Sequence, residues 1–111
     1  MYAGNSLSPM VLEDPHKQRT WLITGCSSGL GKDLVLAALQ TGDRVIATAR
    51  RLEDLDYVQN EKGAFAVQLD VCNPEDVLRA KIGKIVTQFG SIDVLVNNAG
   101  FVAAGVWEEL K

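Results

Sequence analysis

The 111-residue sequence has too few cysteines for a disulfide framework or a cysteine-based metal site. The two that it has, Cys26 and Cys72, are far apart in the sequence and match no metal-ligand spacing. We therefore expect two reduced thiols and no bound metal, in a cytoplasmic protein.

Long apolar runs and clusters of basic residues are also missing. No apolar stretch reaches the ~18 residues of a membrane span, and residues 1–19 lack the basic start and apolar block of a signal peptide. The formal net charge of -3, with dispersed basic residues, argues against nucleic acid or an anionic membrane as a partner. We interpret residues 1–19 as a flexible polar arm that precedes one globular domain, residues 20–111.

The sequence does contain a regular alternation of short apolar runs and amphipathic segments. The apolar runs predict four buried strands, at residues 20–25, 44–49, 64–71 and 92–98. The intervening segments predict a helix at 29–41, a short exposed helix with a turn at 52–63, and a helix at 74–89. This order predicts an α/β fold, a Rossmann-type doubly wound parallel sheet with right-handed crossovers and strand order 3-2-1-4.

Apolar spacing and end signals give more detail for the two longer helices. In the first, Leu30, Leu34 and Ala38 form the expected buried stripe, with Val35 and Leu39 beside it. Gly42 is the expected left-handed cap.

The second helix has clear signals at both ends. Asn73 is the expected N-cap, Pro74 the first helical residue, and Gly90 the stop. The expected buried stripe consists of Leu78, Ile82, Ile85 and Phe89.

The segment "TGCSSGLG", residues 24–31 and here called the glycine loop, follows the first strand and opens the first helix. We expect Gly25 to take a tight turn, Gly29 to let a ligand approach the backbone, and Gly31 to let the helix pack against the strand. Free N–H groups at the helix start and the hydroxyls of Ser27 and Ser28 favour an anionic group such as pyrophosphate. The alternative is a plain glycine turn.

The loop spacing is neither G-x-G-x-x-G nor a Walker loop, because no Gly-Lys-Ser/Thr follows. Gly25-x-x-x-Gly29-x-Gly31 instead resembles the short-chain dehydrogenase/reductase family. Asp70-Val71 falls where that family places an aspartate that contacts adenine, and "NNAG", residues 97–100, is similar to a family signature that lines the adenosine side. The resemblance implies these cofactor-binding residues: Gly25, Ser27, Ser28, Gly29, Leu30, Gly31, Arg50, Asp70, Val71, Asn98, Ala99 and Gly100.

The end of the second strand bears on the choice of cofactor. An acidic residue there would bind the ribose diol of NAD, but this sequence has Ala49 followed by Arg50 and Arg51. By the family pattern this favours NADP over NAD, although Ser28 stands where many NADP-dependent members carry a basic residue. The alternative is that both arginines are solvated surface charges.

The resemblance implies an oxidoreductase that interconverts a carbonyl and an alcohol of a small molecule by hydride transfer. The family's acid/base tyrosine lies in a Tyr-x-x-x-Lys motif, but Tyr2 and Tyr57 are followed four residues later by Ser6 and Glu61. No catalytic residue can therefore be assigned, and we expect the chain alone to be inactive.

The resemblance also implies that this chain is the amino-terminal half of a longer enzyme. Residues 105–111 have the pattern of a helix cut in its first turns, so we expect the domain to be incomplete at its carboxyl end. The fourth strand would then lie at an open sheet edge, which predicts self-association. The alternative function is a non-catalytic nucleotide-binding or interaction module.

Overall fold

A computed structural model describes residues 17–27 and 29–98 of the chain. Residues 1–16, which make up most of the expected arm, and residues 99–111 lie outside the described residues. The elements follow in the order β1 (Thr20–Ile23), α1 (Gly29–Gln40), β2 (Arg44–Ala49), the 3₁₀ helix η1 (Leu52–Val58), β3 (Ala64–Gln68), α2 (Glu75–Phe89) and β4 (Val94–Val96).

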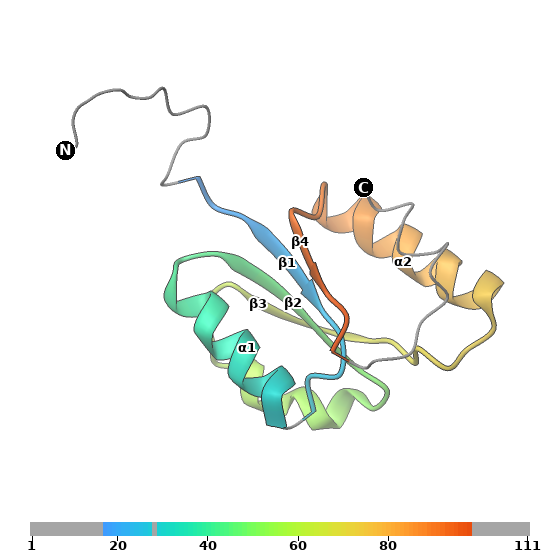
Figure 1. The fold of residues 1–111 in the computed structure, drawn as a ribbon, viewed down its shortest axis with the longest axis horizontal. Helices are drawn as coiled ribbons and strands as arrows, with labels where there is room; N and C mark the ends of the chain where they lie inside the picture. The colour runs from blue at the N-terminus through green and yellow to red at the C-terminus, as the bar shows by residue number, and fades with distance from the viewer. Residues whose placement is uncertain (1–16, 28, 99–111) are drawn as a thin grey trace.

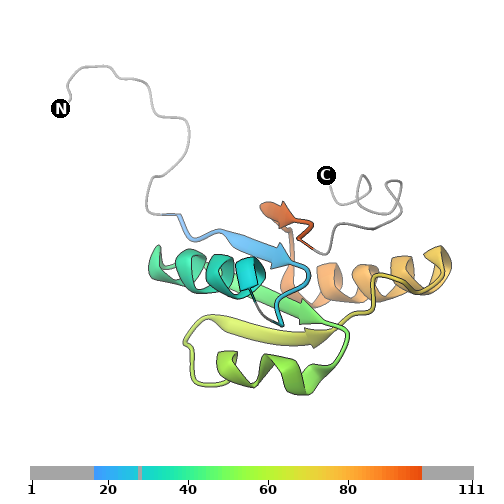
Figure 2. The same ribbon diagram turned by 60° about the horizontal axis from the view of Figure 1, so that its bottom comes forward.

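The strands form one parallel sheet in the order β3-β2-β1-β4, which confirms the predicted fold class and strand order. In the central pairs, Leu22 of β1 is opposite Ile46 of β2 and Leu95 of β4. Figure 2 shows the strands stacked in this order, from β3 at the bottom to β4 at the top. Because all strands run in the same direction, their carboxyl ends meet at one edge of the sheet.

Helices cover both faces of this sheet. Figure 1 shows α1 and η1 on one side and α2 on the other. Side chains alternate between the faces, so Ile23 and Ala47 pack with α1 and η1, whereas Leu22 and Ile46 pack against α2. The two apolar clusters hold the sheet between its helices.

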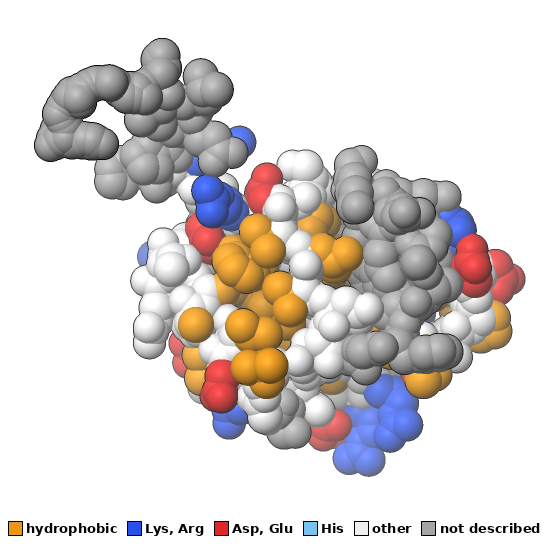
Figure 3. All heavy atoms as spheres, viewed as in Figure 1, with side chains coloured by type: hydrophobic (Ala, Val, Ile, Leu, Met, Phe, Trp, Pro, Cys, Tyr) orange, Lys and Arg blue, Asp and Glu red, His pale blue; other side chains and the backbone are white. Residues whose placement is uncertain are grey.

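The predicted stripe of α1 is wrong at its first residue. Leu30 is 65% exposed, and the buried residues are Gly31, Val35 and Ala38, spaced i, i+4, i+7. One helical residue is a rotation of about 100°, so a helix that turns Gly31 toward the sheet must turn Leu30 away from it. Figure 3 shows hydrophobic side chains gathered on the face over α1 and the neighbouring strands β1 and β4.

Two further predictions need correction. The segment after β2 is a seven-residue 3₁₀ helix that buries Leu55 and Val58, so it is only partly exposed. The N-cap of α2 is Pro74 rather than Asn73, because Pro74 has a non-helical ψ of 151° and its carbonyl accepts the first helical hydrogen bond, from the Leu78 N–H at 3.0 Å. Gly42 and Gly90 end their helices with φ of 88° and 84°, as expected for glycines that stop helices.

The middle of α2 provides a test of helix propensity that is separate from packing. Gly83 is exposed, and a Cβ built on it would meet nothing within 4 Å in the described structure. We expect Gly83→Ala to raise the free energy of unfolding by about 1 kcal/mol, because glycine has the lower helix propensity. Urea denaturation measures the change, and Ala80→Gly, at another exposed position of α2, should lower stability by a similar amount. An unchanged or reduced stability of Gly83→Ala would contradict the prediction.

Candidate functional site

The glycine loop connects the carboxyl end of β1 to the first turn of α1. Gly25 and Gly29 have φ of 66° and 63°, in the left-handed region that favours glycine. A Cβ built on Gly29 would meet no described atom within 4 Å, so the backbone here faces open space. The loop therefore leaves room for a ligand to approach the main chain beside the amino end of a helix, where N–H groups favour an anion.

Gly31 has the opposite surroundings. A Cβ on this residue would overlap the carbonyl oxygen of Gly25 and lie 2.8 Å from Nδ2 of Asn98. That Asn98 amide donates to the same Gly25 oxygen at 3.0 Å. The first turn of α1, the glycine loop and the segment after β4 thus meet at one point, in agreement with the close packing predicted for Gly31.

The glycine loop is also bound to β2 through its backbone. The Cys26 N–H donates to the Thr48 carbonyl at 3.0 Å, and the buried Thr48 hydroxyl donates to the Ile23 carbonyl at 3.1 Å. Cys26 is completely buried. These bonds satisfy polar groups that would otherwise be buried without partners.

A tyrosine from η1 also forms a hydrogen bond with the loop. The Tyr57 hydroxyl donates to the Cys26 carbonyl at 2.6 Å, and Lys32 Nζ lies 5.0 Å from the centre of the Tyr57 ring. Neither Tyr57 nor Thr48 was predicted as a site residue from the sequence. The sequence feature that could have indicated Tyr57 is an aromatic residue with a polar hydroxyl in a short helix that directly follows β2.

Burial raises the pKa of two groups in this contact. The pKa of the Cys26 thiol is raised to about 11 by desolvation, and the pKa of the Tyr57 hydroxyl is raised to about 12, again chiefly by burial. At neutral pH both groups therefore keep their protons. Cys26 is not an activated thiolate here, and the Tyr57 hydroxyl acts as a hydrogen-bond donor to the loop.

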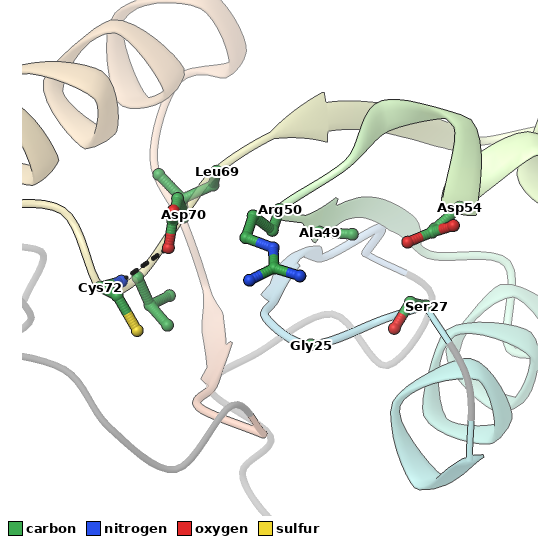
Figure 4. A pocket seen from close by; sticks show the side chains of 9 residues that line it. Gly25, Ser27, Ala49, Arg50, Asp54, Leu69, Asp70 and Cys72 are labelled. Atoms are coloured by element: carbon green, nitrogen blue, oxygen red, sulfur yellow. Dashed lines mark hydrogen bonds between the residues drawn. The ribbon is translucent and has the colours of Figure 1, made fainter.

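A cavity of about 290 Å³ opens at the carboxyl ends of β1, β2 and β3. Figure 4 shows that the glycine loop, the start of η1 and the segment after β3 supply its walls. Its lining residues are Gly25, Ser27, Ala49, Arg50, Asp54, Leu69, Asp70, Val71 and Cys72. We call it the carboxyl-end cavity.

Five of the predicted cofactor-binding residues line this cavity: Gly25, Ser27, Arg50, Asp70 and Val71. Gly29, Leu30, Gly31 and Asn98 are not among its lining residues. Of these, Gly31 and Asn98 both contact the Gly25 carbonyl of the glycine loop. Ser28, Ala99 and Gly100 lie outside the described residues. The structure thus brings together predicted residues from three separate segments of the sequence.

The two neighbouring arginines have different surroundings. Arg51 forms ion pairs with Glu53 at 3.6 Å and with Asp54 at 3.7 Å. Arg50 makes no ion pair within the part of the chain that the structure describes, and its guanidinium lies in the carboxyl-end cavity (Figure 4). Its backbone is held because the Gln68 amide of β3 donates to the Arg50 carbonyl at 2.9 Å. Arg50 is therefore the cation that is available to a ligand in the cavity.

Asp70 forms the opposite wall of the cavity. Its Oδ1 accepts the Cys72 N–H at 2.9 Å, which fixes the turn that follows β3. Asp54, Leu69 and Cys72 also line the cavity but were not predicted as site residues, and Ala49 was predicted only as the position that lacks a carboxylate. The described residues contain no group of three or more histidine, cysteine or acidic side chains that could hold a metal ion. None of the helices in residues 17–27 and 29–98 is long and apolar enough to cross a membrane.

Comparison with known proteins gives consistent matches. A family model described as short chain dehydrogenase matches residues 19–111. Oxidoreductase BOA17 of Botryotinia fuckeliana is 45% identical over 96 residues, which cover 83% of this chain and 34% of that protein. Oxidoreductase calM of Penicillium decumbens is 40% identical over 96 residues, 82% of this chain and 31% of that protein. The chain thus spans about a third of the length of these relatives.

Solved structures with similar folds include a short-chain dehydrogenase from Streptomyces avermitilis, with a TM-score of 0.68 and 39% identity. The match covers 74% of this chain and 31% of that one. A metagenomic short-chain oxidoreductase, solved in complex with NADP, has a TM-score of 0.68 and 33% identity, and the match covers 75% of this chain and 37% of that one.

The contact between Tyr57 and the glycine loop predicts a pH-dependent stability difference. At neutral pH, Tyr57→Phe should lower the free energy of unfolding by about 1 kcal/mol, because the Cys26 carbonyl loses its donor. The pKa of Tyr57 is about 12 in the folded chain, against about 10 for an exposed tyrosine. Its contribution is therefore fully present below pH about 10 and is lost as the pH rises to about 12.

Urea denaturation of both proteins at several pH values measures this difference. Cys26 is present in both proteins. Its titration is therefore common to both, and the pH dependence of the stability difference between them reports on Tyr57. A difference that stays constant from neutral pH to about pH 12 would contradict the assigned hydrogen bond.

Proposed function

The chain belongs to the short-chain dehydrogenase family, and we propose that it forms the NADP(H)-binding part of an oxidoreductase of that family. The whole protein would interconvert a carbonyl and an alcohol of a small molecule by hydride transfer. The observation that carries the proposal is the position of Arg50. Its guanidinium lies in the carboxyl-end cavity, next to the glycine loop and without an ion-pair partner among the described residues.

The described residues fit a dinucleotide with a 2′-phosphate. The backbone at Gly29 faces open space at the amino end of α1, which suits the pyrophosphate. The Ser27 hydroxyl, on the wall of the cavity, can donate to the same group. Arg50 would bind the 2′-phosphate through charge-assisted hydrogen bonds. Asp70 would accept from the amino group of adenine on the opposite wall.

When bound, the nicotinamide ring of NADPH would supply the hydride. The described residues would bind and orient the adenosine end of the cofactor, and Asn98 would keep the glycine loop in its binding conformation through the Gly25 carbonyl. The solved relative in complex with NADP supports the choice of cofactor. NAD is the less favoured cofactor, because Ala49 stands where a carboxylate would bind the ribose diol.

Cofactor selection tests the role of Arg50. In the wild type we expect a roughly ten- to hundredfold preference for NADP over NAD, since a charge-assisted contact is worth about 1.5–3 kcal/mol. Arg50→Ala should remove most of this preference while leaving the affinity for NAD nearly unchanged. Titration calorimetry with both cofactors measures the two affinities.

Lys62→Ala is the matched control, because Lys62 is an exposed cation beside the amino end of β3, away from the carboxyl-end cavity. It removes the same charge and should keep the preference. Equal affinities of the wild type for NADP and NAD, or an unchanged preference in Arg50→Ala, would overturn the assignment of Arg50.

Catalysis tests whether binding and turnover separate in this chain. Neither Tyr2 nor Tyr57 is in a Tyr-x-x-x-Lys motif, and a positioned acid/base is typically worth 10²–10⁴-fold in rate. We expect the 111-residue chain to bind NADPH without oxidising it above background in the presence of aldehydes, quinones or steroid ketones. Loss of NADPH absorbance measures turnover.

A longer chain that supplies the family's catalytic motif should restore the reaction. Saturable turnover by the 111-residue chain would contradict the separation. If the longer chain binds NADPH and is also inactive with carbonyl substrates, the alternative of a nucleotide-binding module is favoured.

A further inference from the structure

A carboxylate shares the carboxyl-end cavity with Arg50. Asp54, from the first turn of η1, lines the cavity together with Arg50 and Ser27. Figure 4 shows its carboxylate on the side of the cavity formed by η1 and the glycine loop. A negative charge in this position opposes the binding of a phosphate, whereas the Arg50 guanidinium favours it.

Arg51 only partly neutralises this carboxylate. Its Nε lies 3.7 Å from Oδ2 of Asp54 and 3.6 Å from Oε2 of Glu53, so one cation is shared by two carboxylates. The Asp54 side chain is 38% exposed and that of Glu53 is 67% exposed. Asp54 is therefore the more sheltered of the two acids, and of these two it alone lines the cavity.

We propose that Asp54 is a specificity-determining residue that limits the preference of this chain for NADP over NAD. Its charge weakens the binding of the 2′-phosphate of NADP. The same carboxylate can accept a hydrogen bond from the free 2′-hydroxyl of NAD. This inference rests on the proposed function of the cavity and adds a second, opposing determinant to Arg50.

The size of the effect follows from the exposure of the groups. Charges near a protein surface interact through a high effective dielectric constant and are screened by salt. Removal of the Asp54 charge should therefore raise the affinity for NADP by about 3- to 10-fold. It should not raise the affinity for NAD, which has no 2′-phosphate.

The test compares two variants that each remove one acidic partner of Arg51. Asp54→Asn and Glu53→Gln change the net charge equally, and each removes one ion pair of Arg51. Dissociation constants for NADP and NAD are measured by titration calorimetry at low ionic strength. We expect tighter binding of NADP by Asp54→Asn, a change of less than about twofold for Glu53→Gln, and no gain in NAD affinity for either variant.

The outcomes separate the inference from the proposed function. If the wild type prefers NADP and both variants change NADP affinity equally, only general charge is involved and the inference fails while the proposed function stands. A gain in NAD affinity equal to that in NADP affinity also overturns the inference. If the wild type binds neither cofactor, the proposed function fails as well.

Discussion

The contact between Gly31 and the carbonyl of Gly25 is the constraint on which the arrangement of this site depends. A Cβ on Gly31 would overlap this carbonyl and crowd the Asn98 amide that donates to it, so the first turn of α1 can lie here only because residue 31 has no side chain. The carboxyl ends of β1 and β4 and the amino end of α1 are thereby held at one point. A residue with a Cβ would push α1 away from the sheet, and the open backbone at Gly29 would move with it.

The walls of the carboxyl-end cavity are held by hydrogen bonds whose acceptors are backbone carbonyls. Thr48, Cys26 and Tyr57 form a series of hydrogen bonds that joins β1, β2 and η1 beneath the glycine loop. Arg50 and Asp54 lie in the sequence between Thr48 and Tyr57. The segment that carries them is therefore hydrogen-bonded to the glycine loop both before Arg50 and after Asp54. Their side chains determine the charge of the cavity, whereas its shape depends on groups that substitution at these two positions leaves in place.

Much of the fold could be predicted because parallel strands and amphipathic helices leave periodic patterns in the sequence. The glycine spacing likewise located the loop, and Asp70 and Arg50 could be placed because they closely follow the ends of strands. Tyr57 and Asp54 could not, since a short 3₁₀ helix has no apolar period long enough to orient its residues. Leu30 was misplaced for a different reason: the close approach of Gly31, a tertiary contact, determines the rotation of α1 and overrides the apolar pattern.

The protonation and hydrogen bonding of Tyr57 support the proposed separation of cofactor selection from acid/base chemistry in the described part of the chain. A general acid or base needs a pKa near the working pH and a free path to the reacting group. The Tyr57 hydroxyl has a pKa raised to about 12 and donates to the Cys26 carbonyl. Its proton is therefore held in a hydrogen bond to the glycine loop and is not available for transfer to a substrate at neutral pH. Its hydrogen bond fixes the loop, and in the proposed function the charged cavity residues Arg50 and Asp54 would act on the 2′-phosphate of a dinucleotide rather than on a carbonyl. Under the proposed function, substitution in this region would change the selection of the cofactor and leave the acid/base chemistry unchanged, because the family assigns that chemistry to a tyrosine in a different sequence context.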